Sequence, residues 1–276
     1  MRLVLIWSAI GLCSWDLARG LEAAEPARQV IILKLDDVTA HGAHGHLPVS
    51  PRWQRVADFI EQSHIKASFG IIGSSLEQDN PAYFEWIKGL DKKGIIEFWN
   101  HGYKDRTVAD KTGEFEGSLE EQQHALKRTQ SLAKKKLGIE LKAFGPHWSG
   151  TTPDTEKALE GFPEIKMWFY GPQDSKTFVF ERVLTLENPT FVPDFDKFKE
   201  RYERIARDKA CLALQGHPNQ WNEQRWAGFV KIIGYLKSKG CVFMTPSDYL
   251  STVKGTARCN RSRGTVPIFA AVTGQP

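Results

Sequence analysis

Carboxylates and an imidazole follow two of the apolar stretches in this sequence at spacings that suit metal-assisted hydrolysis. Asp36 and Asp37 follow the first stretch, and His101 follows a later one with Asp105 four residues beyond it. An imidazole together with carboxylates forms a ligand set for zinc or a neighbouring transition metal. The first hypothesis is therefore a divalent metal ion held between strand-end carboxylates and His101.

Each of these signals also has an ordinary structural explanation. An aspartate pair after a strand can cap a helix or bind magnesium, and a histidine near an aspartate is often a surface pair. Adjacent side chains of a strand cannot both point one way, so we expect one aspartate to bind a metal while its neighbour faces the reacting water as a base. His41, His44 and His46 lie in a glycine-rich segment, which is either a further metal site or a solvated loop.

These residues need a scaffold that brings the ends of separate strands together. Short apolar runs alternate with amphipathic stretches, which predicts an α/β fold with crossover helices around a largely parallel sheet. Reactive groups in such folds collect at the carboxyl ends of the strands, where His147 and His217 also fall. Strands are expected at 30–35, 66–72, 95–99, 141–144, 211–215 and 242–244, and helices at 52–62, 81–93, 118–136, 194–207 and 222–239.

Length and composition indicate one globular domain. A chain of 276 residues with 25% charged residues fits neither a disordered nor a fibrous class. The formal net charge of +4 is too small to indicate a nucleic-acid partner. Cys211, Cys241 and Cys259 fit either one bridge between Cys241 and Cys259 or three free thiols.

The first 24 residues have the features of a secretory signal peptide. Arg2 precedes an apolar run from Leu3 to Trp15, and Ala23 and Ala24 supply the small residues of a cleavage site. The run is shorter than the roughly 20 residues of a spanning helix, so no stable membrane insertion is expected. The sequence thus predicts a secreted or periplasmic protein with a signal peptide at 1–24, one domain at 25–254 and a loosely ordered tail at 255–276.

The motifs in combination resemble the polysaccharide deacetylases, the family also called carbohydrate esterase family 4 or the NodB homology domain. The resemblance covers most of the chain after the signal peptide. Five segments carry it: Leu35–Val38, Lys66–Phe69, Glu97–Asp105, Phe144–His147 and Leu214–Pro218. It implies a distorted (β/α) barrel and a metal-dependent hydrolase that removes acetyl groups from a polysaccharide or oligosaccharide, N-acetyl in preference to O-acetyl.

The resemblance also implies roles for individual residues. Asp36 would be the catalytic base, and His217 would be the general acid. Asp37, His101 and Asp105 would hold one divalent ion, with zinc expected first and cobalt or manganese as alternatives.

The resemblance further implies that the substrate, an acetylated glycan, contacts Pro146, His147 and Trp148. This chain departs from the family at two positions: Asp105 stands where a second metal-binding histidine is expected, and Phe144 stands where an arginine is expected. His147 is the leading substitute for the missing ligand. The departures leave open a second function, a carbohydrate-binding protein that kept the barrel but lost hydrolysis.

Overall fold

The structure is a computed structural model that describes residues 28–40, 49–104 and 109–253. Several predictions fall outside these residues. They are the signal peptide, the C-terminal tail, the histidines at 41, 44 and 46, Asp105 and Cys259.

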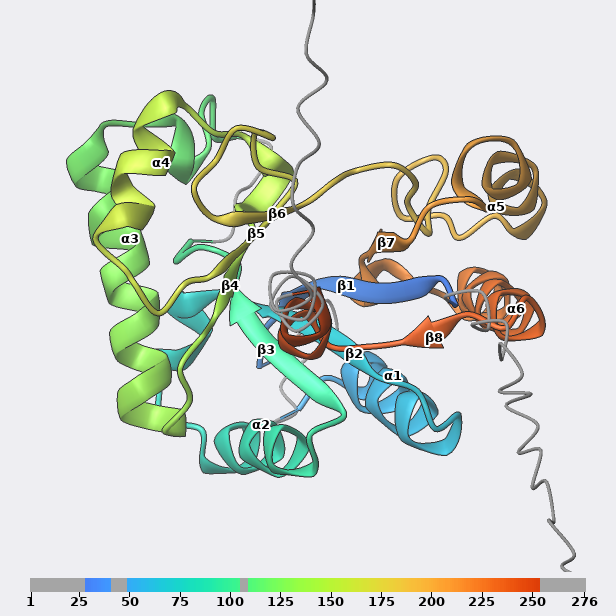
Figure 1. Ribbon diagram of the computed structural model, residues 1–276. Coiled ribbons are helices and arrows are strands. Elements are labelled where there is room, and N and C mark those ends of the chain that lie inside the picture. The colour runs from blue at the N-terminus through green and yellow to red at the C-terminus, as the bar shows by residue number, and fades with distance from the viewer. Residues whose placement is uncertain (1–27, 41–48, 105–108, 254–276) are drawn as a thin grey trace, which may run out of the picture.

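Parallel strands form a nearly closed barrel (Figure 1). The strands pair in the order β6-β5-β4-β3-β2-β1-β7, and β8 pairs with the first residues of β1. The predicted α/β fold, a distorted (β/α) barrel, is confirmed. The strands are β1 (Val30–Val38), β2 (Ala67–Ile71), β3 (Ile96–Asn100), β4 (Ala143–Phe144), β5 (Met167–Phe169), β6 (Phe178–Phe180), β7 (Cys211–Gly216) and β8 (Val242–Phe243).

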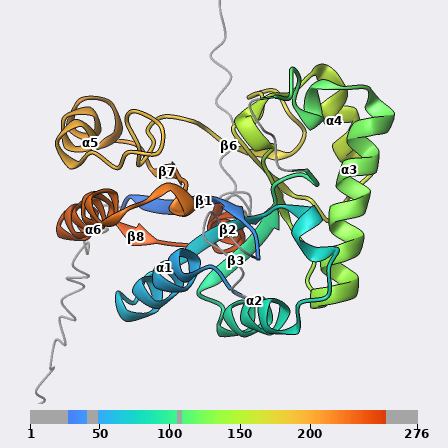
Figure 2. The ribbon, with the colours of Figure 1, turned by 180° about the vertical axis from the view of Figure 1, so that it is seen from behind.

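Helices surround the sheet, as the views from the two sides show (Figures 1 and 2). None of them, within the part of the chain described, is long and apolar enough to cross a membrane. The α-helices are α1 (Pro51–Gln62), α2 (Pro81–Lys93), α3 (Leu119–Leu132), α4 (Pro153–Glu160), α5 (Phe195–Arg201) and α6 (Glu223–Ser238).

Local sequence explains where these helices begin and end. The side chain of Asn80 caps α2, Pro81 occupies its first turn, and Gly94 ends it with a φ of +67°. Ser118 and Glu121 form the reciprocal capping box at the start of α3 that the sequence predicts. These helix ends set the lengths of the helices that connect the strands, and therefore the residues at which the next strands begin.

The alternation of side chains along β1 divides the core into two layers. Ile31 and Leu33 belong to the larger cluster that packs against the surrounding helices, whereas Ile32 belongs to the smaller cluster inside the barrel. Lys34 and Asp36 follow the alternation of Ile32 and are buried. A charged pair therefore continues the interior face of β1 toward the carboxyl end of the strand.

Candidate functional site

Strand β1 is irregular where its two aspartates stand. Its pairing with β2 shifts between Leu35 and Val38, and Asp37 has a φ of +71°. A bulge with a left-handed residue breaks the alternation of side chains. The Nε2 atom of His101 consequently lies 3.6 Å from Asp36 Oδ2 and 3.1 Å from Asp37 Oδ1. The expectation that the two aspartates point apart is therefore wrong, and both lie within β1 rather than after it.

The His101 side chain is held by the backbone of a neighbouring strand end. His101 directly follows β3, and its Nδ1 donates to the carbonyl oxygen of Gly145, which follows β4. Because a carbonyl only accepts, Nδ1 carries the proton, and the Nε2 of a neutral ring presents its lone pair to Asp37. A lone pair that faces a carboxylate needs a proton or another cation between them. Histidines that bind metals are commonly held by a hydrogen bond from their other ring nitrogen, as His101 is held here by Gly145.

His147 reaches the same carboxylate from the short 3-10 helix His147–Ser149 that follows β4. Its Nε2 lies 3.6 Å from Asp37 Oδ1, and its ring centroid lies 5.3 Å from that of His101. Burial, and then the neighbouring His101, lower the pKa of His147 to about 4. The ring is therefore neutral at neutral pH and can offer a lone pair.

The donor types of Asp37, His101 and His147 suit zinc or a similar ion. Among residues 28–40, 49–104 and 109–253, no group of three or more His, Cys, Asp or Glu side chains is placed so that it could hold a metal ion. Tetrahedral zinc ligands bound at about 2.0–2.2 Å lie roughly 3.4 Å from one another. The separations of 3.1 Å and 3.6 Å between Asp37 Oδ1 and the two Nε2 atoms are close to that value.

Asp36 lies in a strongly cationic environment inside the barrel. The Nζ atom of Lys34 lies 2.6 Å from each carboxylate oxygen of Asp36, and Gln215 Nε2 donates to Oδ2 at 2.7 Å. Burial alone would raise the pKa of Asp36, but Lys34, followed by His101 and His217, lowers it below its ordinary value. Asp36 is therefore an ionised carboxylate held by two donors.

His217, directly after β7, is oriented by Glu187. Its Nδ1 donates to Glu187 Oε2 at 2.7 Å, and its backbone N–H donates to Glu187 Oε1 at 2.8 Å. Its Nε2 lies 3.8 Å from Asp36 Oδ2. Burial lowers the pKa of His217, but the hydrogen bond to Glu187 and the charge of Asp36 outweigh it and raise the pKa overall. The protonated ring, with Nε2 on the side of Asp36, can serve as an acid.

Two exposed aromatic side chains flank these groups. Trp148 is 52% exposed and lies 6.3 Å from the His147 ring, while Phe191 is 38% exposed and meets the His217 ring edge-on at 5.0 Å. Both have a positive φ, a conformation that concentrates at functional sites. Pro146 precedes the 3-10 helix, and its carbonyl accepts from Ser149. Aromatic faces beside the reactive groups are suited to stacking on sugar rings.

The sequence prediction missed Lys34, Gln215, Glu187 and Phe191. The first two carried a usable signal, because Lys34 stands two residues before Asp36 on the same face of β1 and Gln215 stands two residues before His217. Glu187 and Phe191 belong to the irregular segment between 168 and 193, where no periodic pattern predicts which side chain turns inward.

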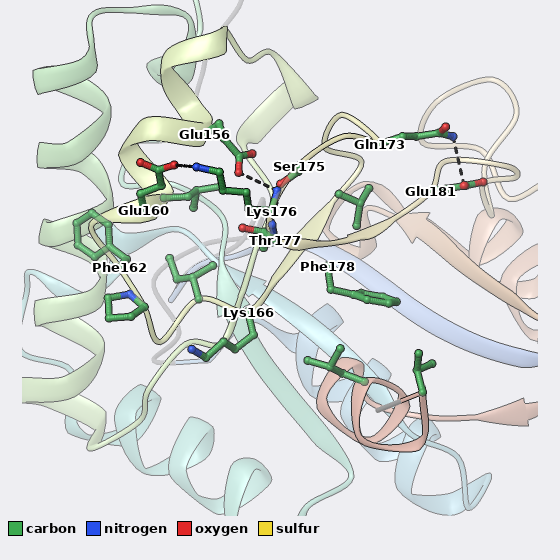
Figure 3. A pocket seen from close by; sticks show the side chains of 16 residues that line it. Glu156, Glu160, Phe162, Lys166, Gln173, Ser175, Lys176, Thr177, Phe178 and Glu181 are labelled. Carbon is green, nitrogen blue, oxygen red and sulfur yellow. Dashed lines mark hydrogen bonds and ion pairs between the residues drawn. The ribbon is translucent and has the colours of Figure 1, made fainter. Parts of the chain in front are cut away.

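A separate cavity of about 760 Å³ lies between α4, the start of β6 and the helical residues 246–253 (Figure 3). Its charged side chains pair within its own wall: Lys176 Nζ lies 2.5 Å from Glu160, and the Lys176 backbone N–H donates to Glu156 at 2.9 Å. It faces residues that begin β6, whereas the reactive groups lie at or near the carboxyl ends of the strands. None of those groups lines it, so it is not the candidate active site.

Sequence comparison identifies no relative, since no family model and no curated protein matches this chain. Solved structures do share its fold. The Xyl-CE4 domain of a multidomain xylanase from the hindgut metagenome of Trinervitermes trinervoides superposes with a TM-score of 0.58 and 19% identity, covering 82% of this chain and 92% of that one. A family 4 acetyl xylan esterase from Clostridium thermocellum, in complex with cobalt, gives 0.56 and 19% over the same shares.

A CE4 family pseudoenzyme from Bacillus anthracis is similar as well. It gives a TM-score of 0.55 and 15% identity, covering 81% of this chain and 66% of that one. At these identities the likeness establishes the shared barrel fold.

Proposed function

We propose that this chain is a metal-dependent hydrolase that removes acetyl groups from a polysaccharide or oligosaccharide, N-acetyl in preference to O-acetyl. One observation carries the proposal. The ionised carboxylate of Asp36 lies between an acid, His217, and the metal-type donors Asp37 and His101. A base, an acid and a cation site within one cluster are what amide or ester hydrolysis requires.

The proton transfers follow from the positions of the two catalytic groups. Asp36 removes a proton from the attacking water while the new C–O bond forms at the acetyl carbon. His217 then donates its Nε2 proton to the leaving nitrogen as the C–N bond breaks, giving acetate and a free amine. Gln215 and Glu187 keep the base and the acid oriented through these steps.

Asp37, His101 and His147 are the proposed metal ligands, with zinc best suited and cobalt or manganese as alternatives. A divalent ion bound there supplies Lewis-acid polarisation of the acetyl carbonyl. Asp105, the third ligand expected from the sequence, is the alternative to His147. Variants of these two residues separate the two ligand sets.

The proposed substrate is an acetylated glycan outside the cytoplasm. The signal-like features of residues 1–24 support secretion or export to the periplasm. Trp148 and Phe191 support binding of sugar rings next to the reactive groups, and the turn at Pro146 positions Trp148.

The direct test uses the purified chain loaded in turn with zinc, cobalt and manganese. We expect about one metal ion per chain, as in single-ion catalytic sites, and acetate release from chitooligosaccharides that exceeds release from acetylated xylan. Metal content is measured by elemental analysis and acetate by an enzyme-coupled assay. A fully loaded chain that releases acetate from neither substrate would contradict the proposed reaction.

A second candidate is a carbohydrate-binding protein without hydrolysis. It is favoured by the exposed aromatic side chains Trp148 and Phe191, together with the absence of a complete ligand cluster among the described residues. The same experiment separates the two functions. Calorimetric binding of chitooligosaccharides without acetate release, whichever metal is supplied, would support the binding protein.

Glu187→Gln is expected to lower activity most strongly at alkaline pH. Glu187 raises the pKa of His217, so its neutral replacement lowers that pKa. A general acid works only while protonated, and activity falls as pH rises through its pKa. The alkaline limb of the kcat/KM profile should therefore move to lower pH.

The matched control for this prediction is Glu160→Gln, which alters a glutamate of the separate cavity that pairs with Lys176. Its pH profile should equal that of the unaltered chain. An unchanged alkaline limb in Glu187→Gln would mean that Glu187 does not act through His217.

A further inference from the structure

A lysine lies inside the barrel beneath the proposed base. Lys34 is in the middle of β1, on the same face of the strand as Ile32 and Asp36, and its side chain is 1% exposed. Its Nζ atom lies 2.6 Å from both oxygens of the equally buried Asp36. The ammonium therefore contacts both carboxylate oxygens equally, and it does so inside the barrel, away from solvent.

Aromatic rings lie around the ammonium, and the Arg182 guanidinium lies over one of them, 4.2 Å from the centroid of Tyr170. Nζ lies 4.7 Å from the ring centroid of Trp99, 5.3 Å from Tyr170 and 5.7 Å from Phe169. These rings attract a cation but cannot replace a carboxylate as its partner. Asp36 is the only acidic residue within ion-pair distance of Lys34 among the described side chains. The aromatic rings thus hold the Lys34 Nζ atom in one position, and from that position it binds the Asp36 carboxylate.

Stability alone gives a weak reason for a charged pair at this place. Apolar residues of similar volume are often as stabilising as a buried ion pair, because both charges lose their hydration. Lys34 is surrounded by the interior cluster that contains Ile32, Trp99 and Phe169. Because this cluster is apolar, a methionine would suit the same position. A role in the site explains the lysine better.

The cation also comes from an unexpected strand. Phe144 occupies the position on β4 where the resemblance implies an arginine, and it packs in a different cluster against Phe115 at 4.7 Å and Trp168 at 5.9 Å. Its side chain therefore contributes nothing to Asp36. Lys34 approaches Asp36 from within β1 itself, and Gln215 approaches it from β7.

We propose that Lys34 is a positioning residue that holds the Asp36 carboxylate in one orientation, so that it can accept the proton of the attacking water. The inference rests on the proposed role of Asp36 as the base. Lys34 does not touch the substrate, because it is buried beneath the carboxylate. Its effect should therefore fall on the chemical step rather than on substrate binding.

The test is Lys34→Met, alone and combined with Asp36→Asn. We expect Lys34→Met to lower kcat for acetate release on the order of 100-fold, the scale of one general-base contribution, and to leave KM within about twofold. In the Asp36→Asn background, measured with an activated aryl acetate, Lys34→Met should cause no further loss. Equal losses in the two backgrounds would overturn the proposal, since Lys34 would then act independently of Asp36.

The matched control is Lys66→Met. Lys66 pairs with Asp248 at 2.8 Å, and both are partly exposed, on residues that precede β2 and follow β8. This variant should keep kcat and KM. Urea unfolding of all the variants shows whether each loss of activity occurs in a folded chain, and a kcat for Lys34→Met within about twofold of the unaltered chain would overturn the proposal.

Crystal structures of the unaltered chain and of Lys34→Met decide the question even if no acetate is released. The absence of acetate release would contradict the proposed reaction, but the orientation of the Asp36 side chain could still be compared between the two structures. We expect the Asp36 side chain to leave its single orientation and its contact with Gln215 in the variant, while the backbone of β1 stays in place. An Asp36 carboxylate unchanged in the variant would show that Lys34 does not position it.

Discussion

Asp36→Asn is expected to lower kcat for acetate release by about 10²–10⁴-fold, the range contributed by one general base. Asparagine keeps the shape of the side chain, and its oxygen can still accept from Lys34 or Gln215, but it cannot take a proton from water. Bound metal should remain, because Asp36 is not among the proposed ligands. Metal content and steady-state kinetics on the same preparation measure both effects.

The control must separate loss of the base from loss of a buried ion pair. Removing one partner of such a pair costs about 3–5 kcal/mol, because it leaves the other charge buried without a counter-charge. Asp248→Asn makes the same chemical change in the partly exposed pair with Lys66 and should leave activity intact. Full activity in Asp36→Asn would remove Asp36 from the mechanism, and loss of metal from that variant would make it a ligand.

His101→Ala is expected to abolish metal binding, and His147→Ala is expected to weaken it by at least about 100-fold. Losing a hydrogen-bond partner of a ligand costs roughly 10–100-fold in affinity, and losing a ligand should cost more. His101 is the more severe loss, because its Nε2 lies closer to Asp37 and its ring is fixed by Gly145. Competition with a chromophoric zinc chelator measures each affinity.

Asp105→Ala distinguishes the two candidate ligand sets. If His147 is the third ligand, Asp105→Ala keeps its zinc affinity while His147→Ala loses it. The reverse result would establish the set expected from the sequence, Asp37, His101 and Asp105. His64→Asn serves as the control, because His64 is exposed and precedes β2, at the end of the barrel away from the site.

The sequence was sufficient to predict the scaffold and the strand ends that carry the reactive groups. Periodic apolar runs predicted the parallel strands, and strand-end polar residues pointed to Asp36, Asp37, His101 and His217. Both signals are local: alternation and capping depend on neighbouring residues, and parallel strands of a barrel place their carboxyl ends on one side. The meeting of these four side chains follows from that common direction.

The sequence was not sufficient to predict how the side chains at those ends are oriented. The bulge in β1 turns Asp37 toward His101, against the alternation on which the prediction relied. Glu187 reaches His217 from a segment without periodicity, where contacts far apart in the chain decide which residue turns inward. No local pattern encodes such contacts.

The sequence by itself determined the parallel α/β scaffold and the candidate residues at its strand ends. Only the tertiary structure decided which partners they have: His147 beside Asp37, Glu187 on His217 and Lys34 beneath Asp36. The physical reason is that strand order and register set which side chains share the interior. Electrostatic partnership between side chains depends on distance in space rather than on separation along the chain.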